Sequence, residues 1–187
     1  MPSPRLQVEL PSWVEGFVDW QRNYPRLEDR MALVLELGHE QVRRATGGPF
    51  TAAVFERDSG VLVAVGVNMA VPAHNCVLHA EVVDVMMACA RLHSHSLGVD
   101  GMPRHELVSS CEPCAMCLGA TLWSGVARLV TGATKADAEA IGYDEGPVFP
   151  ESYAYLERRG VAVVRQVLRE QARTLFAEYQ AAGGVIY

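Results

Sequence analysis

The 187-residue sequence is 50% hydrophobic and 20% charged, a composition that can bury a substantial core. Its formal net charge of -6 disfavours a nucleic-acid partner, because non-specific binding to nucleic acid depends on cationic surfaces. No apolar run reaches the roughly 18 to 20 residues of a membrane span, and the start lacks the pattern of a signal peptide. We therefore expect a cytoplasmic protein with no membrane partner and no nucleic-acid partner.

Helix and strand patterns alternate along the first part of the chain. Residues 28–45 repeat apolar side chains at helical spacing and end at a Thr-Gly-Gly-Pro stop. Two runs rich in Val and Ala, 51–57 and 61–68, are joined by Asp-Ser-Gly and predict a β-hairpin. A buried helix is expected over 79–91 and a strand over 106–110.

The second part of the chain continues the alternation. The expected elements are a helix at 114–124, a strand at 126–133, short helices at 135–140 and 152–158, a strand at 161–165 and a helix at 168–182. Helices between strands predict an α/β fold, a three-layer α/β/α sandwich around a central mixed sheet of about five strands. We expect one domain over 1–187, with an N-terminal helical extension at about 1–47 and a C-terminal helix and tail at about 167–187.

Two helix starts carry residues that are typical of a zinc site. Cys114 and Cys117 are three apart and share a face of their helix, where the positive end of the helix dipole favours thiolates. With His79 they make three ligands, and three protein ligands with an open position are the arrangement of catalytic zinc, whereas structural sites have four. The sequence therefore predicts one Zn²⁺ per subunit, with a bound water or hydroxide.

Glu81 is the expected catalytic base. Zn²⁺ with two thiolates and a neutral histidine is a nearly neutral centre, so it acidifies water less readily than an all-histidine site. A nearby base is then needed, and Glu81 lies two residues from the ligand His79. It is placed to take a proton from water and to pass it to a ring nitrogen and to the departing amine. Burial is expected to raise the pKa of this carboxyl and suit it to proton transfer.

The pairing of His-Ala-Glu at 79–81 with Pro-Cys-Ala-Met-Cys at 113–117 resembles the cytidine/deoxycytidylate deaminase superfamily. The residues at 110–120 and 140–146 are similar to those of its guanine deaminase branch. The resemblance implies a cytidine deaminase-like fold and zinc-dependent hydrolytic deamination of a purine base, converting guanine to xanthine and ammonia. It also implies a homodimer that exchanges its C-terminal segments, which would give the apolar tail at 185–187 a place to dock.

The resemblance assigns roles to five further residues. Asn68 would hydrogen-bond the edge of the base through its amide, which both donates and accepts, and Ala80 would also contact the substrate. Phe50 and Tyr143 would sandwich the ring of the base. Glu145 would be a second carboxylate at the pocket that helps proton transfer to the substrate.

Two departures from the branch leave other functions open. Leu78 is bulkier than the usual alanine and is expected to reshape the pocket wall, and Tyr143 adds a hydroxyl where phenylalanine is common. The alternatives are deamination of cytosine, a nucleoside, a pterin or a triazine, editing of tRNA, or a non-catalytic zinc-stabilised interaction module.

Cys111 offers a fourth zinc ligand. With Cys114 and Cys117 it also fits part of an iron–sulfur pattern, although the fourth cysteine of that pattern is absent.

Overall fold

The computed structural model describes residue 3 and residues 5–187. Its helices are α1 (Trp13–Phe17), α2 (Leu27–Arg44), α3 (Ala80–Arg91), α4 (Ala115–Ser124), α5 (Lys135–Glu139), α6 (Pro150–Arg158) and α7 (Arg169–Ala181). Its strands are β1 (Thr51–Glu56), β2 (Leu62–Val67), β3 (His105–Cys111), β4 (Arg128–Ala133) and β5 (Ala162–Val164). The predicted elements are confirmed with ends that shift by two residues at most, and α1 is an addition. In the described part of the chain, none of the helices is long and apolar enough to cross a bilayer.

The strands form one mixed sheet in the order β2-β1-β3-β4-β5. Strand β1 runs antiparallel to both β2 and β3, whereas β3, β4 and β5 are parallel to one another. With these directions, the start of β1 and the ends of β2, β3 and β4 all lie at the same edge of the sheet. Segments that are far apart in the sequence therefore meet at this edge, which we call the site edge.

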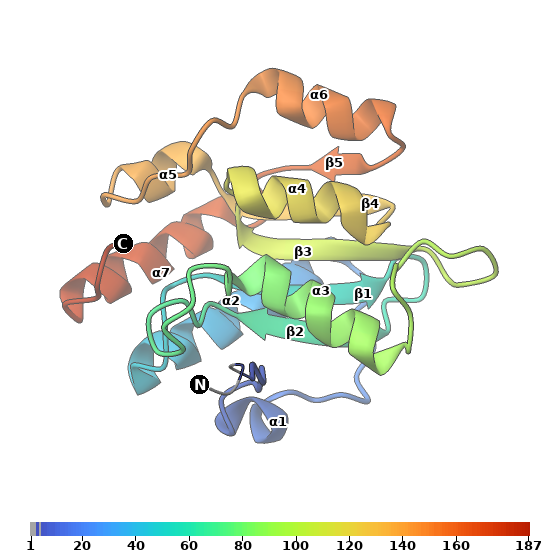
Figure 1. The fold of residues 1–187 in the computed structure, drawn as a ribbon. Coiled ribbons are helices and arrows are strands. Elements are labelled where there is room, and N and C mark those ends of the chain that lie inside the picture. Colours follow the sequence, from blue (N-terminus) through green and yellow to red (C-terminus); the bar gives the residue numbers. More distant parts are fainter. Residues whose placement is uncertain (1–2, 4) are drawn as a thin grey trace.

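Helices cover both faces of the sheet and make the three layers that the sequence predicts (Figure 1). Helices α2 and α7 pack together on one face, around a core cluster that includes Leu37, Phe55 and Leu175. Helices α3 and α4 lie side by side on the other face, over a second cluster that includes Leu107 and Leu129. Because α3 and α4 both begin at the site edge, their first turns meet there.

Candidate metal centre and active site

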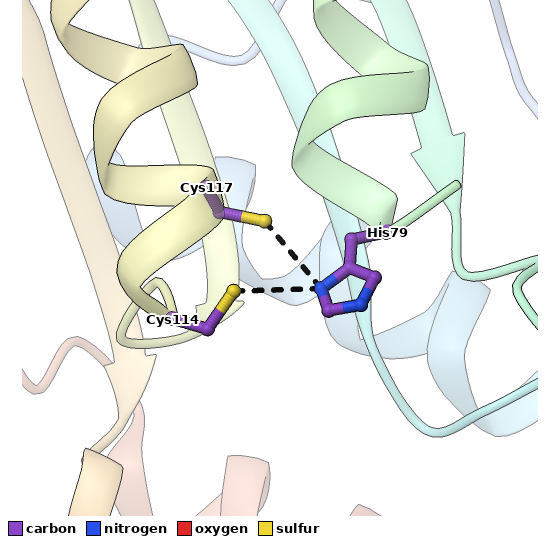
Figure 2. Close-up of side chains that lie close together, drawn as sticks. All are labelled: His79, Cys114 and Cys117. Atoms are coloured by element: carbon purple, nitrogen blue, oxygen red, sulfur yellow. Dashed lines mark hydrogen bonds between the residues drawn. The ribbon is translucent and has the colours of Figure 1, made fainter. Parts of the chain in front are cut away.

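Three potential metal ligands meet where α3 and α4 begin (Figure 2). His79 is the N-cap residue of α3, Cys114 is the N-cap residue of α4, and Cys117 lies in the first turn of α4. The Sγ atoms of Cys114 and Cys117 lie 3.5 and 3.6 Å from Nδ1 of His79, and the three ligand atoms all lie within 4.8 Å of one another. Sulfur and nitrogen ligands arranged tetrahedrally around Zn²⁺ are about 3.6 Å apart, so these residues fit the metal.

The thiol of Cys114 is prepared for ionisation. A hydrogen bond from Cys117, supported by His79, lowers the pKa of Cys114 to about 4. The same hydrogen bond between the two cysteines raises the pKa of Cys117, because the second thiol stays protonated while the first is charged. A divalent cation between the sulfur atoms stabilises both thiolates, so the donor set suits a metal better than it suits a pair of free thiols.

Cys111 lies outside the group of ligand atoms that the described residues form. It is the last residue of β3, and its Sγ donates a hydrogen bond to the carbonyl oxygen of Thr134 at 3.5 Å. Burial holds the pKa of Cys111 well above its usual value, which disfavours the thiolate that a metal requires. The cluster therefore has three protein ligands, the number found in catalytic zinc sites.

A cavity of about 180 Å³ opens beside the cysteine and histidine cluster at the site edge. Its walls are formed by Phe50, Asn68, His79, Glu81, Glu112, Cys114, Tyr143, Asp144, Glu145 and Tyr187. Seven of the nine predicted site residues are among them, and Cys117 lies with His79 and Cys114 at the metal cluster. A larger hollow, of about 470 Å³, lies around residues 97–104, 125–127 and 159–161, and none of the predicted site residues line it.

Glu81 lies in the first turn of α3 and is 6% exposed. The hydroxyl group of Ser109 on β3 donates a hydrogen bond to Oε1 of Glu81 at 3.3 Å, which orients the carboxyl group. Burial raises the pKa of Glu81, because the ionised carboxylate loses its hydration. Burial also raises the pKa of Glu145 to about 8. The cavity therefore holds two carboxyl groups whose raised pKa values suit them to bind and release protons.

The side chain of Asn68 is held in place at the cavity wall. Asn68 is 1% exposed, and its Oδ1 accepts a hydrogen bond from the backbone N–H of Ala70 at 3.1 Å. The side-chain amide of Gln41 donates to the backbone carbonyl of Asn68 at 2.8 Å. The amide of Asn68 is thus presented to the cavity in a fixed orientation.

Phe50 and Tyr143 contact each other edge to face, with ring centroids 4.8 Å apart and an interplanar angle of 75°. A flat base between them needs a separation of about 7 Å, twice the carbon–carbon contact distance. The sandwich therefore requires these rings to move apart, and it stays a prediction. The Tyr143 hydroxyl donates a hydrogen bond to the carbonyl oxygen of Val185 at 3.5 Å. The C-terminal segment therefore contacts Tyr143, one of the two residues that were expected to contact the base.

Two residues lie elsewhere than expected. Ala80 is fully buried in the core cluster beneath α3, and it is not among the residues that line the cavity. Leu78 is 3% exposed and packs with Val67, Met69 and Val83, away from the cavity wall. The bulk of Leu78 therefore fills a hydrophobic cluster, and the expectation that it reshapes the substrate pocket is corrected.

Tyr187 and Glu112 also line the cavity; the sequence assigned no role to Glu112, and for Tyr187 it predicted only that the tail at 185–187 docks. The Tyr187 ring lies 5.6 Å from the Tyr143 ring, so the last residue of the sequence covers part of the cavity. The signal for Tyr187 was the apolar chain end, since a terminus is normally polar and frayed unless it docks. Glu112 accepts hydrogen bonds from the Lys135 backbone N–H at 2.9 Å and from Arg165 at 2.5 Å, contacts that only the folded chain creates.

The chain matches the family model of the cytidine and deoxycytidylate deaminase zinc-binding region over residues 26–133. It is 32% identical over 134 residues to the guanine deaminase of Bacillus subtilis, covering 72% of this chain and 81% of that protein. It is 30% identical over 115 residues to a tRNA-specific adenosine deaminase of Haemophilus influenzae, covering 62% of each. A solved structure of guanine deaminase from Nitrosomonas europaea has a TM-score of 0.91 and 44% identity, and the match covers 97% of this chain and 99% of that one.

The mixed sheet, the three metal ligands and the buried glutamate beside them define a zinc-dependent aminohydrolase, an enzyme that replaces an amino group with water. The family model matches more than half of the sequence and includes all three ligands and Glu81. The chain belongs to the cytidine and deoxycytidylate deaminase family.

Proposed function

We propose that this chain hydrolyses guanine to xanthine and ammonia. The observation that carries the proposal is the meeting, at one cavity, of a three-ligand zinc cluster with two buried carboxyl groups of raised pKa, Glu81 and Glu145. The choice of a purine base is supported by the similarity to guanine deaminases. It is also supported by a solved complex with 2,6-diaminopurine, whose protein is 46% identical with a TM-score of 0.91 over 97% of this chain.

In this proposal the two carboxyl groups divide the proton transfers. When bound, Zn²⁺ acidifies the water that attacks the ring. Glu81 accepts a proton from that water and delivers it to the ring nitrogen next to the reacting carbon. Glu145, whose pKa burial raises to about 8, donates a proton to the departing amine and regains one from the hydroxyl group left on the ring carbon, which becomes the carbonyl of xanthine. Asn68 hydrogen-bonds the edge of the base, and the Phe50 and Tyr143 rings contact its face.

We extend the proposal to the whole chain as one deaminase domain. The C-terminal helix α7 packs on α2 and β4, and the tail after it reaches the cavity at Tyr187. The C-terminal part of the chain thus contributes to the same site.

The test is an assay of zinc-loaded protein with guanine, followed by ultraviolet absorbance and by release of ammonia. The proposal expects turnover of guanine. It would be overturned if protein that holds one zinc per chain left guanine unchanged. A panel with cytosine, a nucleoside, a pterin and a triazine then identifies any other substrate.

A second test uses the variant Glu81→Gln, which is expected to keep its zinc and its fold while kcat falls by orders of magnitude. In a non-catalytic interaction module, Glu81→Gln would change neither the zinc content nor the fold, and there would be no turnover to lose.

We also propose a homodimer that meets through α4. This helix has no charged residue, and its outward side carries Met116 and Trp123, which are 36% and 78% exposed, whereas Thr121 and Ser124 are buried. A helix that is apolar on its outer side is normally covered. Because each chain carries a net charge of -6, an uncharged face lets two copies meet with little repulsion.

The dimer proposal includes exchange of the C-terminal segment. In this structure the C-terminal segment contacts the site of its own chain, since Val185 accepts a hydrogen bond from the Tyr143 hydroxyl. An exchange would transfer this contact to the partner. Light scattering of the wild type is expected to give the mass of two chains, and Trp123→Glu the mass of one. A monomeric wild type would contradict the dimer.

A further inference from the structure

The loop that carries Glu145 has no regular structure of its own. It lies between α5 and α6, and Gly142 and Gly146 within it have φ angles of +107° and +66°, which glycine adopts readily. Glu145 is nevertheless 7% exposed and directed to the cavity. Such a loop holds a side chain in place only through contacts with the elements around it.

Two hydrogen bonds from neighbouring helices hold this loop at consecutive residues. The backbone N–H of Ala115, the first residue of α4, donates to the carbonyl oxygen of Glu145 at 3.0 Å. The Nζ of Lys135 donates to the carbonyl oxygen of Gly146 at 2.6 Å. Inside the loop, Oδ1 of Asp144 accepts from the N–H of Gly146 at 2.8 Å. Lys135 therefore supplies a charged side-chain anchor directly beside Glu145, and charge-assisted hydrogen bonds are stronger than neutral ones.

Lys135 is itself held firmly. It is the first residue of α5, where Thr134 and Asp137 form a capping box around the helix start. Its backbone N–H donates to Oε2 of Glu112, which precedes the Pro-Cys turn of the metal cluster, and its Nζ lies 3.4 Å from Glu139. One residue thus connects the turn before the zinc ligands to the loop of the second carboxylate.

The composition of the chain sets Lys135 apart as well. It is the single lysine in the sequence, in which the other 15 of the 16 basic residues are arginines. A lysine carries a compact ammonium group on a flexible stem, whereas an arginine carries a wide planar fork. The compact group suits a contact with one backbone carbonyl in a partly buried position.

From this geometry we propose that Lys135 is a positioning residue for Glu145. Its ammonium group ties the Gly146 carbonyl to α5 and so keeps the Glu145 carboxyl at the cavity, at a set distance from the metal cluster. The inference rests on the proposed role of Glu145 in proton transfer. A carboxyl displaced by about 1 Å transfers protons poorly, and such misplacements cost up to about 100-fold in rate.

The test uses Lys135→Met, which keeps most of the stem and removes the ammonium group. We expect kcat with guanine to fall about 10-fold to 100-fold while KM changes by less than about threefold, because Glu145 acts in proton transfer more than in binding. Zinc content and melting temperature are measured on the same samples. Arg104→Met is the matched control, because it removes a positive charge at the distant hollow, and we expect it to keep the wild-type kcat.

A double-mutant cycle with Glu145→Gln shows through which residue Lys135 acts. If Lys135 works through Glu145, adding Lys135→Met to Glu145→Gln lowers kcat no further, whereas independent effects multiply. Full activity of Glu145→Gln alone overturns the proposed role of Glu145. Suppose that Glu145→Gln loses activity. If Lys135→Met then keeps the wild-type kcat, or if the two substitutions lower kcat by the product of their separate effects, the positioning role of Lys135 is overturned and the proposed function stays intact.

Discussion

At Gly66 in β2, helix α3 lies directly against the backbone of the sheet. A Cβ atom added at this position would be 2.1 Å from the carbonyl oxygen of Ala80, 2.5 Å from the backbone nitrogen of Asp84 and 2.7 Å from its Cβ. The first two are backbone atoms and the third moves with the backbone, so no side-chain rotation relieves the overlap. Gly66→Ala therefore pushes the first turns of α3 away from the sheet.

The size of this displacement follows from the distances. Ordinary contact begins at 3.4 Å, so the Ala80 carbonyl has to retreat by the difference between 3.4 and 2.1 Å, which is 1.3 Å. Ala80 lies between His79 and Glu81, so a residue of the metal cluster and the proposed catalytic base move with it. A misplacement of about 1 Å costs on the order of 100-fold in rate. Overpacking of the core also costs about 1–3 kcal/mol of unfolding free energy.

Three measurements check this prediction on Gly66→Ala: kcat with guanine, zinc affinity by competition with a chromogenic chelator, and urea unfolding. Gly16→Ala in α1 is the matched control, because a Cβ there meets no atom within 4 Å. We expect the control to match the wild type in rate and zinc affinity. If Gly66→Ala also matches the wild type, close seating of α3 on β2 does not position His79 and Glu81, and the reasoning is refuted.

Three further predictions concern stability. Leu78→Ala is expected to lower the free energy of urea unfolding by about 2–5 kcal/mol, because it leaves a hole in a buried cluster, and to leave KM for guanine unchanged; a new substrate preference would contradict its placement. Hydrogen bonds from Arg169 hold the pKa of Asp137 below its usual value, so its carboxylate stabilises the fold above about pH 4 and this stabilisation is lost as the pH falls further. Asp137→Asn should therefore lower the melting temperature at pH 7, and the two melting temperatures should converge in acid; a constant gap would argue against this ion pair. Removal of zinc by a chelator should lower the melting temperature, and added Zn²⁺ should restore it, because the metal stabilises the thiolates of Cys114 and Cys117; an equal melting temperature without zinc would count against the site.

Local patterns in the sequence were sufficient for every helix and strand except α1, and for the metal motif. Cys114 and Cys117 share a helix face because of their spacing alone, and a histidine at the start of another helix completes a ligand set that is recognisable without coordinates. Glu81 follows from the same reasoning, since it lies two residues from His79. The helices and strands were also readable, because apolar periodicity and Gly or Pro stops are local signals.

The tertiary structure decided everything that depends on contacts between distant segments. The order of the strands brings the start of β1 and the ends of β2, β3 and β4 to one edge, and no local pattern specifies that order. Leu78 is adjacent to a zinc ligand in sequence but packs into a separate hydrophobic cluster. Tyr187 lies more than 100 residues from His79 in sequence, yet both line the same cavity. The sequence by itself thus indicated the ligand types of the metal site, because Cys114 and Cys117 are spaced by helix geometry and His79 begins a second helix. Only the folded chain decided which side chains line the cavity and brought Lys135 to the carbonyl of Gly146, because those contacts arise from long-range packing.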